Sequence, residues 1–390
     1  MLIKSDFLSR FVARSKMEIL QKIDQLKTEL EALRPLDAER EGRIMQKFRL
    51  DWNYHSNHLE GNSLTYGETK ALILFGITAQ GKPLKDHLEM TGHNEAIKWI
   101  EEVVKEERPL TENFIRQLHE LLLKEPYQVD ALTPNGQPTK KWIQIGQYKS
   151  SPNNVVTVTG EIFYFATPEE TPSMMHDLLA WYRSEKEKNE LHPLQLAALF
   201  HYRFIRIHPF DDGNGRTARI LMNFILLQHR LPPVIIKTED KLHYFAALRQ
   251  ADAGLLEPFI EYIGENLERS LDLMVRGARG EPVEEFEDIE KELTLLYQQA
   301  KNNDISIAQL LNKNRLNKAE KEDLQKHLNE KEKQDEKIDD LAEKIGKIKE
   351  IINELLESIN VKDHPELSEI IETIKGMAVK KIVNDSENGF

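Results

Sequence analysis

Residues 208–219 read His-Pro-Phe-Asp-Asp-Gly-Asn-Gly-Arg-Thr-Ala-Arg, and an apolar segment, residues 220–227, follows directly. Glycines on both sides of an asparagine allow backbone N–H groups to turn toward one point. The helix predicted to begin there adds the positive end of its dipole. The loop is therefore suited to bind a polyphosphate, with Gly213, Asn214 and Gly215 as its cradle.

Charged side chains surround this predicted cradle. Asp212 is a hard carboxylate beside it, and Mg²⁺ is commonly bound between protein carboxylates and phosphate oxygens. Arg216 and Arg219 are three residues apart, so they share one helix face and can bind the outer phosphates. His208 precedes the loop, where an imidazole with a pKa near neutrality could take a proton from an attacking hydroxyl.

Residues 208–216 resemble the signature of the Fic family of protein AMP-transferases at every position, and the resemblance extends over most of residues 50–265. It implies a mainly α-helical Fic-type core with a small β-hairpin flap. It also implies transfer of AMP from ATP, with Mg²⁺, to a serine, threonine or tyrosine hydroxyl of a target protein, with release of pyrophosphate. The roles carried over are His208 as the base, Asp212 as the magnesium ligand, and Gly213, Asn214, Gly215 and Arg216 as phosphate contacts.

A second resemblance concerns Ser56-Asn57-His58-Leu59-Glu60-Gly61-Asn62. The family's autoinhibitory motif has a serine or threonine, a glutamate four residues later, and then glycine or asparagine. Ser56 and Glu60 share one helix face, and Gly61 suits a helix end. The resemblance implies that Glu60 pairs with Arg219 and so removes the guanidinium that should hold the γ-phosphate. The position of the motif implies the subclass whose inhibitory helix precedes the core.

Two further segments resemble parts of the Fic site. Residues 155–159 and 162–165 are β-branched or aromatic runs separated by Gly160-Glu161, which predicts a hairpin. It resembles the flap that holds a target segment by strand addition, with the contacts expected at Val155, Val156, Thr157 and Val158. Tyr244 and Asp252 resemble the residues that border the adenine. Lys149 stands where the family more usually has arginine, so it keeps the charge but loses the bidentate fork.

The composition restricts the class of protein. The 66 acidic and 53 basic residues give a formal charge of -13, which makes nucleic acid an unlikely main partner. The chain has no cysteine, so disulfides and thiolate chemistry are excluded and a cytoplasmic location is predicted. No segment approaches the roughly 18 consecutive apolar residues of a membrane span.

We expect three parts along the chain: an N-terminal helical segment at 1–45, the catalytic domain at 46–275 and a C-terminal helical region at 276–390. The catalytic domain includes the inhibitory helix (about 50–62) and the flap (about 143–166). In the C-terminal region a three-and-four spacing predicts a short coiled-coil seam, formed by Ile338, Leu341, Ile345, Ile348, Ile352, Leu355 and Ile359. The seam fits an intrachain helical hairpin and a homo-oligomer equally well.

Three other functions compete with AMP transfer. A metal-dependent hydrolase would need ligands at metal-site spacing, but no HExxH run accompanies the thirteen histidines. A hydrolase that removes AMP from a modified protein could use the same site, with Glu60 orienting the water. A regulatory protein could act through its C-terminal helices, although an intact base, metal ligand and cradle argue against an idle core.

Overall fold

The computed structural model describes residues 18–132, 137–156, 162–283, 286–313 and 317–358. The chain divides into two compact units, and the division falls between Val283 and Glu284. The described residues are mainly α-helical, as the sequence predicted. Among them, no helix combines the length and the apolar character that crossing a bilayer requires.

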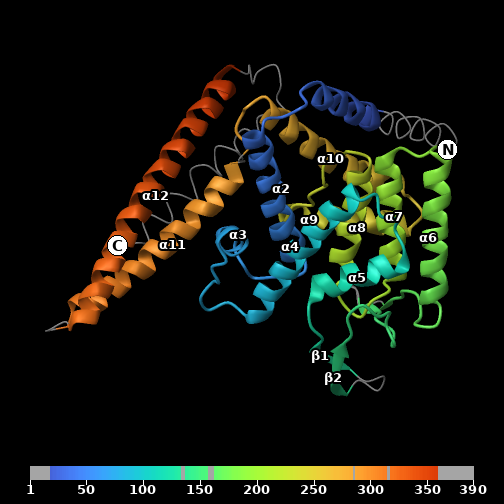
Figure 1. Cartoon of the computed structure of the whole chain (residues 1–390), viewed down its shortest axis with the longest axis horizontal. Coiled ribbons are helices and arrows are strands. Elements are labelled where there is room, and N and C mark those ends of the chain that lie inside the picture. The colour runs from blue at the N-terminus through green and yellow to red at the C-terminus, as the bar shows by residue number, and fades with distance from the viewer. Residues whose placement is uncertain (1–17, 133–136, 157–161, 284–285, 314–316, 359–390) are drawn as a thin grey trace. The chain divides into compact units, whose positions relative to one another are not determined.

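The first unit is a bundle of helices (Figure 1), and it also contains two small antiparallel sheets. Residues 18–32 are helical. The other helices are α2 (Ala38–His58), α3 (Tyr66–Phe75), α4 (Leu84–Lys105), α5 (Glu112–Leu123), α6 (Thr171–Lys188), α7 (Pro193–Ile207), α8 (Asn214–Gln228), the 3₁₀ turn η1 (Thr238–Asp240), α9 (Lys241–Asp252) and α10 (Glu257–Ala278).

Helix α8 is the central element of this unit. Every residue from 216 to 226 is buried, which is typical of a core helix that is covered on all sides. Helices α7, α4, α5 and α2 pack against it. Helix α8, at whose N-terminus the predicted phosphate cradle begins, is therefore held by four neighbouring helices.

Local signals explain where the helices beside the site begin and end. Thr111 caps α5 by accepting a hydrogen bond from the backbone N–H of Phe114 (3.1 Å), as its residue type predicts. Helix α7 ends at Ile207; its C-cap His208 adopts a left-handed backbone conformation (φ 51°), and Pro209 follows it. Gly213 (φ 75°) then turns the chain into α8. The loop thus reverses direction between two packed helices.

Strands β3 (Val155–Val156) and β4 (Ile162–Phe163) form the predicted flap hairpin and pair antiparallel, with Val155 opposite Phe163. Thr157 and Val158 lie outside the described residues. A second hairpin was not expected: β1 (Tyr127–Leu132) pairs antiparallel with β2 (Pro138–Ile143) and projects from the helical body (Figure 1). Its signal was present in the sequence, because Asn135-Gly136 lies between two β-rich runs.

The second unit contains α11 (Phe286–Leu311) and α12 (Lys318–Ser358), which pack against each other. Ile338 and Leu341, the first two residues of the predicted seam, are buried against Leu296 of α11. A polar contact lies farther along the pair, where Asn303 bonds to the carbonyl oxygen (2.8 Å) and the ring Nδ1 (2.6 Å) of His327. This part of the seam therefore forms an intrachain hairpin.

Candidate active site

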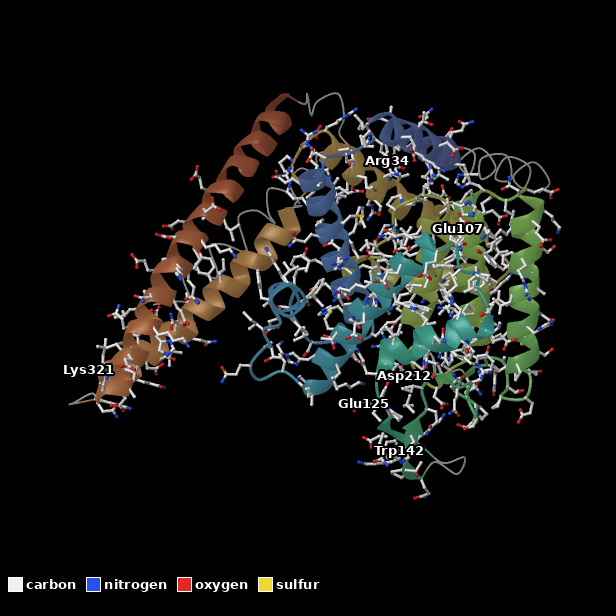
Figure 2. The ribbon with its side chains drawn as sticks, viewed as in Figure 1. Arg34, Glu107, Glu125, Trp142, Asp212 and Lys321 are labelled. Atoms are coloured by element: carbon white, nitrogen blue, oxygen red, sulfur yellow. The ribbon has the colours of Figure 1, made fainter. Side chains whose placement is uncertain are left out.

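The loop between α7 and α8 brings the predicted catalytic residues together. Figure 2 shows Asp212 on the side of the helical body from which the β1–β2 hairpin projects. Asn214 closes the loop: its Oδ1 accepts from the backbone N–H of Phe210 (2.9 Å), and its Nδ2 donates to the carbonyl oxygen of Phe210 (2.8 Å). Phe210 is fully buried and stacks on His119, with ring centroids 3.8 Å apart. The loop is thus anchored in the core.

His208 lies at the edge of this loop with its ring fixed on several sides. Its Nδ1 is 2.7 Å from Nδ2 of Asn153 and 3.2 Å from Nδ2 of Asn214. The ring of Phe165 stacks on the imidazole, with centroids 4.1 Å apart. Burial, with the positive charge of Lys149 acting in the same direction, lowers the pKa of His208 to about 4. The imidazole is therefore neutral at physiological pH, as a proton acceptor must be.

Asp212 has two hydrogen-bond donors. The Tyr127 hydroxyl of β1 donates to Oδ2, and the backbone N–H of Gly213 donates to Oδ1 at 2.6 Å. Burial alone would raise the pKa of Asp212, but Arg216 and these donors outweigh it and lower the pKa. Asp212 is therefore an ionised carboxylate, a ligand type that suits Mg²⁺.

The potential metal ligands near Asp212 suit Mg²⁺ better than they suit a metal ion whose ligands all come from the protein. Within the described ranges, no three His, Cys, Asp or Glu side chains gather into a metal-binding group. Mg²⁺ is usually held by one or two carboxylates together with water and phosphate oxygens. A single ionised carboxylate beside the predicted phosphate cradle is consistent with that pattern.

Arg216 points into the buried interior at the start of α8. It is 2% exposed, and its Nη1 lies 3.3 Å from Glu89 Oε1 of α4. Within the described part of the chain, its Nε makes no hydrogen bond, and its Nη1 has this ion pair but no contact with hydrogen-bond geometry. Buried guanidinium donors are costly to leave unsatisfied. Arg216 therefore keeps an N–H group at Nε that makes no hydrogen bond, and its phosphate contact stays a prediction.

Glu60 and Ser56 of the predicted inhibitory helix both contact Arg219. Oε1 of Glu60 lies 2.7 Å from Nη2 of Arg219, and the same guanidinium donates to Oγ (3.0 Å) and the carbonyl oxygen (2.9 Å) of Ser56. Although desolvation opposes ionisation, Arg219 and Arg216 lower the pKa of Glu60. The structure thus contains the ion pair that the sequence led us to expect.

The carboxylate of Glu60 also lies directly over the cradle. A β-carbon placed on Gly215 would lie 2.3 Å from Glu60 Oε1 and 3.1 Å from Nη1 of Arg219. The first turn of α8 therefore already has a negatively charged oxygen close to its backbone. A helix N-terminus attracts anions, so Glu60 lies where a phosphate group would be stabilised.

Tyr244 and Asp252, the predicted adenine neighbours, both have protein partners. The Tyr244 hydroxyl lies 3.0 Å from Nε2 of the buried His201. Asp252 forms an ion pair with Arg206 (3.5 Å), while the Tyr202 hydroxyl donates to its Oδ1 (3.3 Å). Both residues belong to α9, and neither contact by itself indicates a base.

The predicted flap lies beside His208 at Phe165 and beside α7 at Arg206. Val155 of β3 is 49% exposed, and the guanidinium of Arg206 lies over the Phe163 ring at 4.6 Å. Lys149, by contrast, is buried, and its Nζ bonds to Oδ1 of Asn153 (2.8 Å) and the carbonyl oxygen of Ile207 (3.2 Å). The side chain of Lys149 therefore binds other residues in the protein interior.

Sequence reasoning missed several residues that surround the loop. Lys141 of β2 forms an ion pair with Asp211 (2.5 Å). Nε2 of His119 in α5 lies 3.0 Å from the carbonyl oxygen of Asp212, and its Nδ1 accepts from the backbone N–H of Gly146. The others are Glu89, Tyr127 and Asn153, described above. Only the hairpin that carries Tyr127 and Lys141 had a local signal, because the remaining contacts join separate elements.

Together, these contacts define a helical protein with a glycine-containing loop at the N-terminus of a core helix and an internal carboxylate over that loop. A family model described as "Fic/DOC family" matches residues 109–226. The chain is 44% identical to a Fic domain containing signaling protein from Bacteroides thetaiotaomicron, with a TM-score of 0.63 over 68% of this chain and 99% of that chain.

More distant relatives agree. Fic-1 from Caenorhabditis elegans is 25% identical, with a TM-score of 0.59 over 72% of this chain and 77% of that chain. "Protein adenylyltransferase Fic" from Nematostella vectensis is 32% identical over 262 residues, which are 67% of this chain and 56% of that protein. This chain thus spans little more than half the length of that curated relative. The chain belongs to the Fic/DOC family, as the motif at 208–216 predicted.

Proposed function

We propose that this chain is a protein adenylyltransferase, which moves AMP from ATP to a hydroxyl side chain of a target protein. The observation that carries the proposal is the placement of the His208 imidazole, held at Nδ1 by Asn153 and Asn214, at the edge of the glycine-containing loop whose backbone N–H at Gly213 binds Asp212. Relatives that share this region carry the name protein adenylyltransferase.

Each residue of the loop has one part in the proposed reaction. The backbone N–H groups at Gly213 and Gly215 and the guanidinium of Arg216 hold the triphosphate. His208 takes the proton of the target hydroxyl as its oxygen bonds to the α-phosphorus, and the bond from that phosphorus to the departing pyrophosphate breaks. Asp212 would hold Mg²⁺, which supplies positive charge to offset the phosphate oxygens.

The inhibited state is part of the same proposal. Oε1 of Glu60 lies 2.7 Å from Nη2 of Arg219 and close to the backbone of Gly215. The outer phosphate of a nucleotide and the Glu60 carboxylate would therefore compete for the Arg219 guanidinium and for the N-terminus of α8. Like charges in one site repel each other, so ATP either displaces Glu60 or binds in a pose unsuited to transfer.

Hydrolytic removal of AMP from a modified protein is the second candidate. The specific observation in its favour is that Glu60 is ionised and lies over the cradle, where its oxygen could accept a proton from a water molecule. Both directions use His208, Asp212 and the loop, and they differ in whether Glu60 is needed.

The test compares Glu60→Gly with the unaltered chain in labelling by α-phosphate-labelled ATP, Mg²⁺ and a cell lysate. We expect stronger labelling with Glu60→Gly and none when His208→Ala is added, while nucleotide affinity is kept. Equal labelling by the unaltered chain and by Glu60→Gly would contradict the inhibitory role of Glu60. Labelling that survives His208→Ala would contradict the role of His208 as the base. Loss of label from modified protein in the presence of the unaltered chain, and its retention with Glu60→Gly, would support hydrolysis.

A further inference from the structure

A short segment after β2 is tied to the end of α7 and to the active-site loop. The backbone N–H of Lys149 donates to the carbonyl oxygen of Pro209 (2.8 Å), and its Nζ donates to the carbonyl oxygen of Ile207 (3.2 Å). Only 3% of Lys149 is exposed. These contacts fix the backbone on both sides of His208, and the same Nζ donates to Asn153 Oδ1 (2.8 Å).

Asn153 connects Lys149 to the imidazole. Its Nδ2 lies 2.7 Å from Nδ1 of His208, 2.7 Å from the carbonyl oxygen of Phe210 and 3.1 Å from the carbonyl oxygen of His208. An ammonium group only donates and a carbonyl oxygen only accepts. The amide of Asn153 must therefore point its oxygen at Lys149 and its NH₂ group at the loop, so its orientation follows from three partners of known polarity.

This orientation decides which imidazole nitrogen carries the proton. Nδ1 of His208 faces two NH₂ groups, from Asn153 at 2.7 Å and from Asn214 at 3.2 Å. The Asn214 amide is fixed independently, because its Oδ1 accepts from the N–H of Phe210. A nitrogen surrounded by donors must accept, so the network assigns the proton of the neutral ring to Nε2.

We propose that Asn153, oriented by Lys149, is a positioning residue that holds His208 neutral with its proton on Nε2. For Nε2 to take a proton from a hydroxyl, Nδ1 would have to lose its donors and gain an acceptor. A half-turn of the Asn153 amide would supply that acceptor, but it would turn the NH₂ group toward the Lys149 ammonium. The pair thus opposes proton uptake by the ring. Its consequence for the rate rests on the proposed function, while its effect on the ring does not.

The substitution that separates these effects is Asn153→Asp, which replaces the donor with an acceptor of the same size. The other charged groups that act on His208 are Lys149, Glu60 from the end of α2 and Asp212 from its own loop. We make these variants in the Glu60→Gly chain, which is the parent in this comparison. Glu60 is absent from it and the other two groups are unchanged, so a shift on Asn153→Asp comes from position 153. Ser150→Ala is the matched control, because Ser150 is exposed in the same segment.

Nitrogen NMR of histidine-labelled protein, with His208 assigned by its loss in His208→Ala, measures the tautomer without nucleotide or target. At pH 7 we expect the proton on Nε2 in the parent and in Ser150→Ala, and on Nδ1 in Asn153→Asp. We also expect the acidic limb of the pH–rate profile of Asn153→Asp to lie at least about one pH unit higher, since an acceptor at Nδ1 favours the imidazolium.

An unchanged tautomer and an unchanged acidic limb in Asn153→Asp would overturn the inference. If that variant does not fold, Asn153→Ala replaces it: we expect a higher kcat with little change in the KM for ATP, because the donor that opposes proton uptake at His208 is removed, and an equal or lower kcat would overturn the inference. A parent that shows no transfer at all would contradict the proposed function, and the NMR comparison would still decide the role of Asn153.

Discussion

One guanidinium, that of Arg219, binds Ser56 through two hydrogen bonds and Glu60 through a third. Arg219 is 4% exposed, whereas 38% of the Glu60 side chain remains accessible. The buried contacts to Ser56 position the arginine, and the accessible contact to Glu60 is the one that a ligand can replace. Removal of Glu60 therefore leaves Arg219 anchored and directed at the loop.

Gly215 lies close to Glu60 Oε1, so a substitution at Gly215 can test whether the predicted cradle binds phosphate. We expect Gly215→Ala in the Glu60→Gly background to lower ATP affinity at least about tenfold, because the added methyl group fills the place where a phosphate approaches the backbone. Calorimetric titration with ATP and Mg²⁺ measures this. Gly42→Ala, in α2, is the control, because a β-carbon added at Gly42 would meet no neighbouring atom of the described residues within 4 Å. Equal affinities for both variants would contradict a phosphate site at Gly215.

Tyr127 donates its hydroxyl hydrogen to Asp212, and this contact should affect the magnesium requirement. With Tyr127→Phe we expect the Mg²⁺ concentration for half-maximal transfer to rise by roughly tenfold or more, since partners that orient a ligating carboxylate commonly have effects of that size. Titration of Mg²⁺ at saturating ATP measures it. An unchanged midpoint would show that Asp212 needs no orientation by the β1–β2 hairpin.

Buried histidines should make the protein sensitive to acid. Burial lowers the pKa of His201 to about 3, so between about pH 6.5 and 3 the unfolded chain binds a proton that the native state does not. Stability then falls as the pH falls through this window, by up to about 1.4 kcal/mol per pH unit for each such group. In urea denaturation between pH 7 and 5, His201→Gln should show a shallower decline. The exposed His176→Gln should match the parent, and identical slopes for all three would refute this account.

Removal of the second unit should leave the first one folded. Ile338 and Leu341 are already packed against Leu296 of the same chain, so these positions are not free to join two chains. We expect a chain that stops after Val283 to keep its thermal midpoint and to lose, in light scattering, only the mass of the deleted residues. A larger loss of mass would mean that the second unit holds chains together.

The sequence was sufficient for features that depend on neighbouring residues. The loop at 208–216 could be predicted because its turns, its anion-binding character and the following helix are all encoded within a dozen residues. The Glu60–Arg219 pair joins residues 159 positions apart, and only the family resemblance made that contact predictable.

Other contacts had no signal that a single sequence could show. Asn153 meets His208 across 55 residues, and Tyr127 meets Asp212 across 85; neither residue type is unusual for its segment. Such pairs depend on how separate elements pack around α8. Lys149 illustrates the same limit, because the sequence showed that it keeps a charge without the bidentate fork but did not show which residues that charge contacts, and its burial directs it to Asn153 and Ile207.

The end of α2 is fixed on both sides of Glu60. Residues 50–57 are buried, Lys241 donates to the carbonyl oxygen of Leu59 (2.8 Å), and Asn62 donates to the carbonyl oxygen of Asp86 (2.9 Å). Glu60 can therefore leave Arg219 by rotation of its own side chain while the helix stays in place. Rotations of accessible side chains take picoseconds to nanoseconds, far faster than enzymatic turnover. The basal rate of AMP transfer would then be proportional to the fraction of time that Glu60 spends turned away from Arg219. The inhibited protein would therefore keep a low, constant transfer activity.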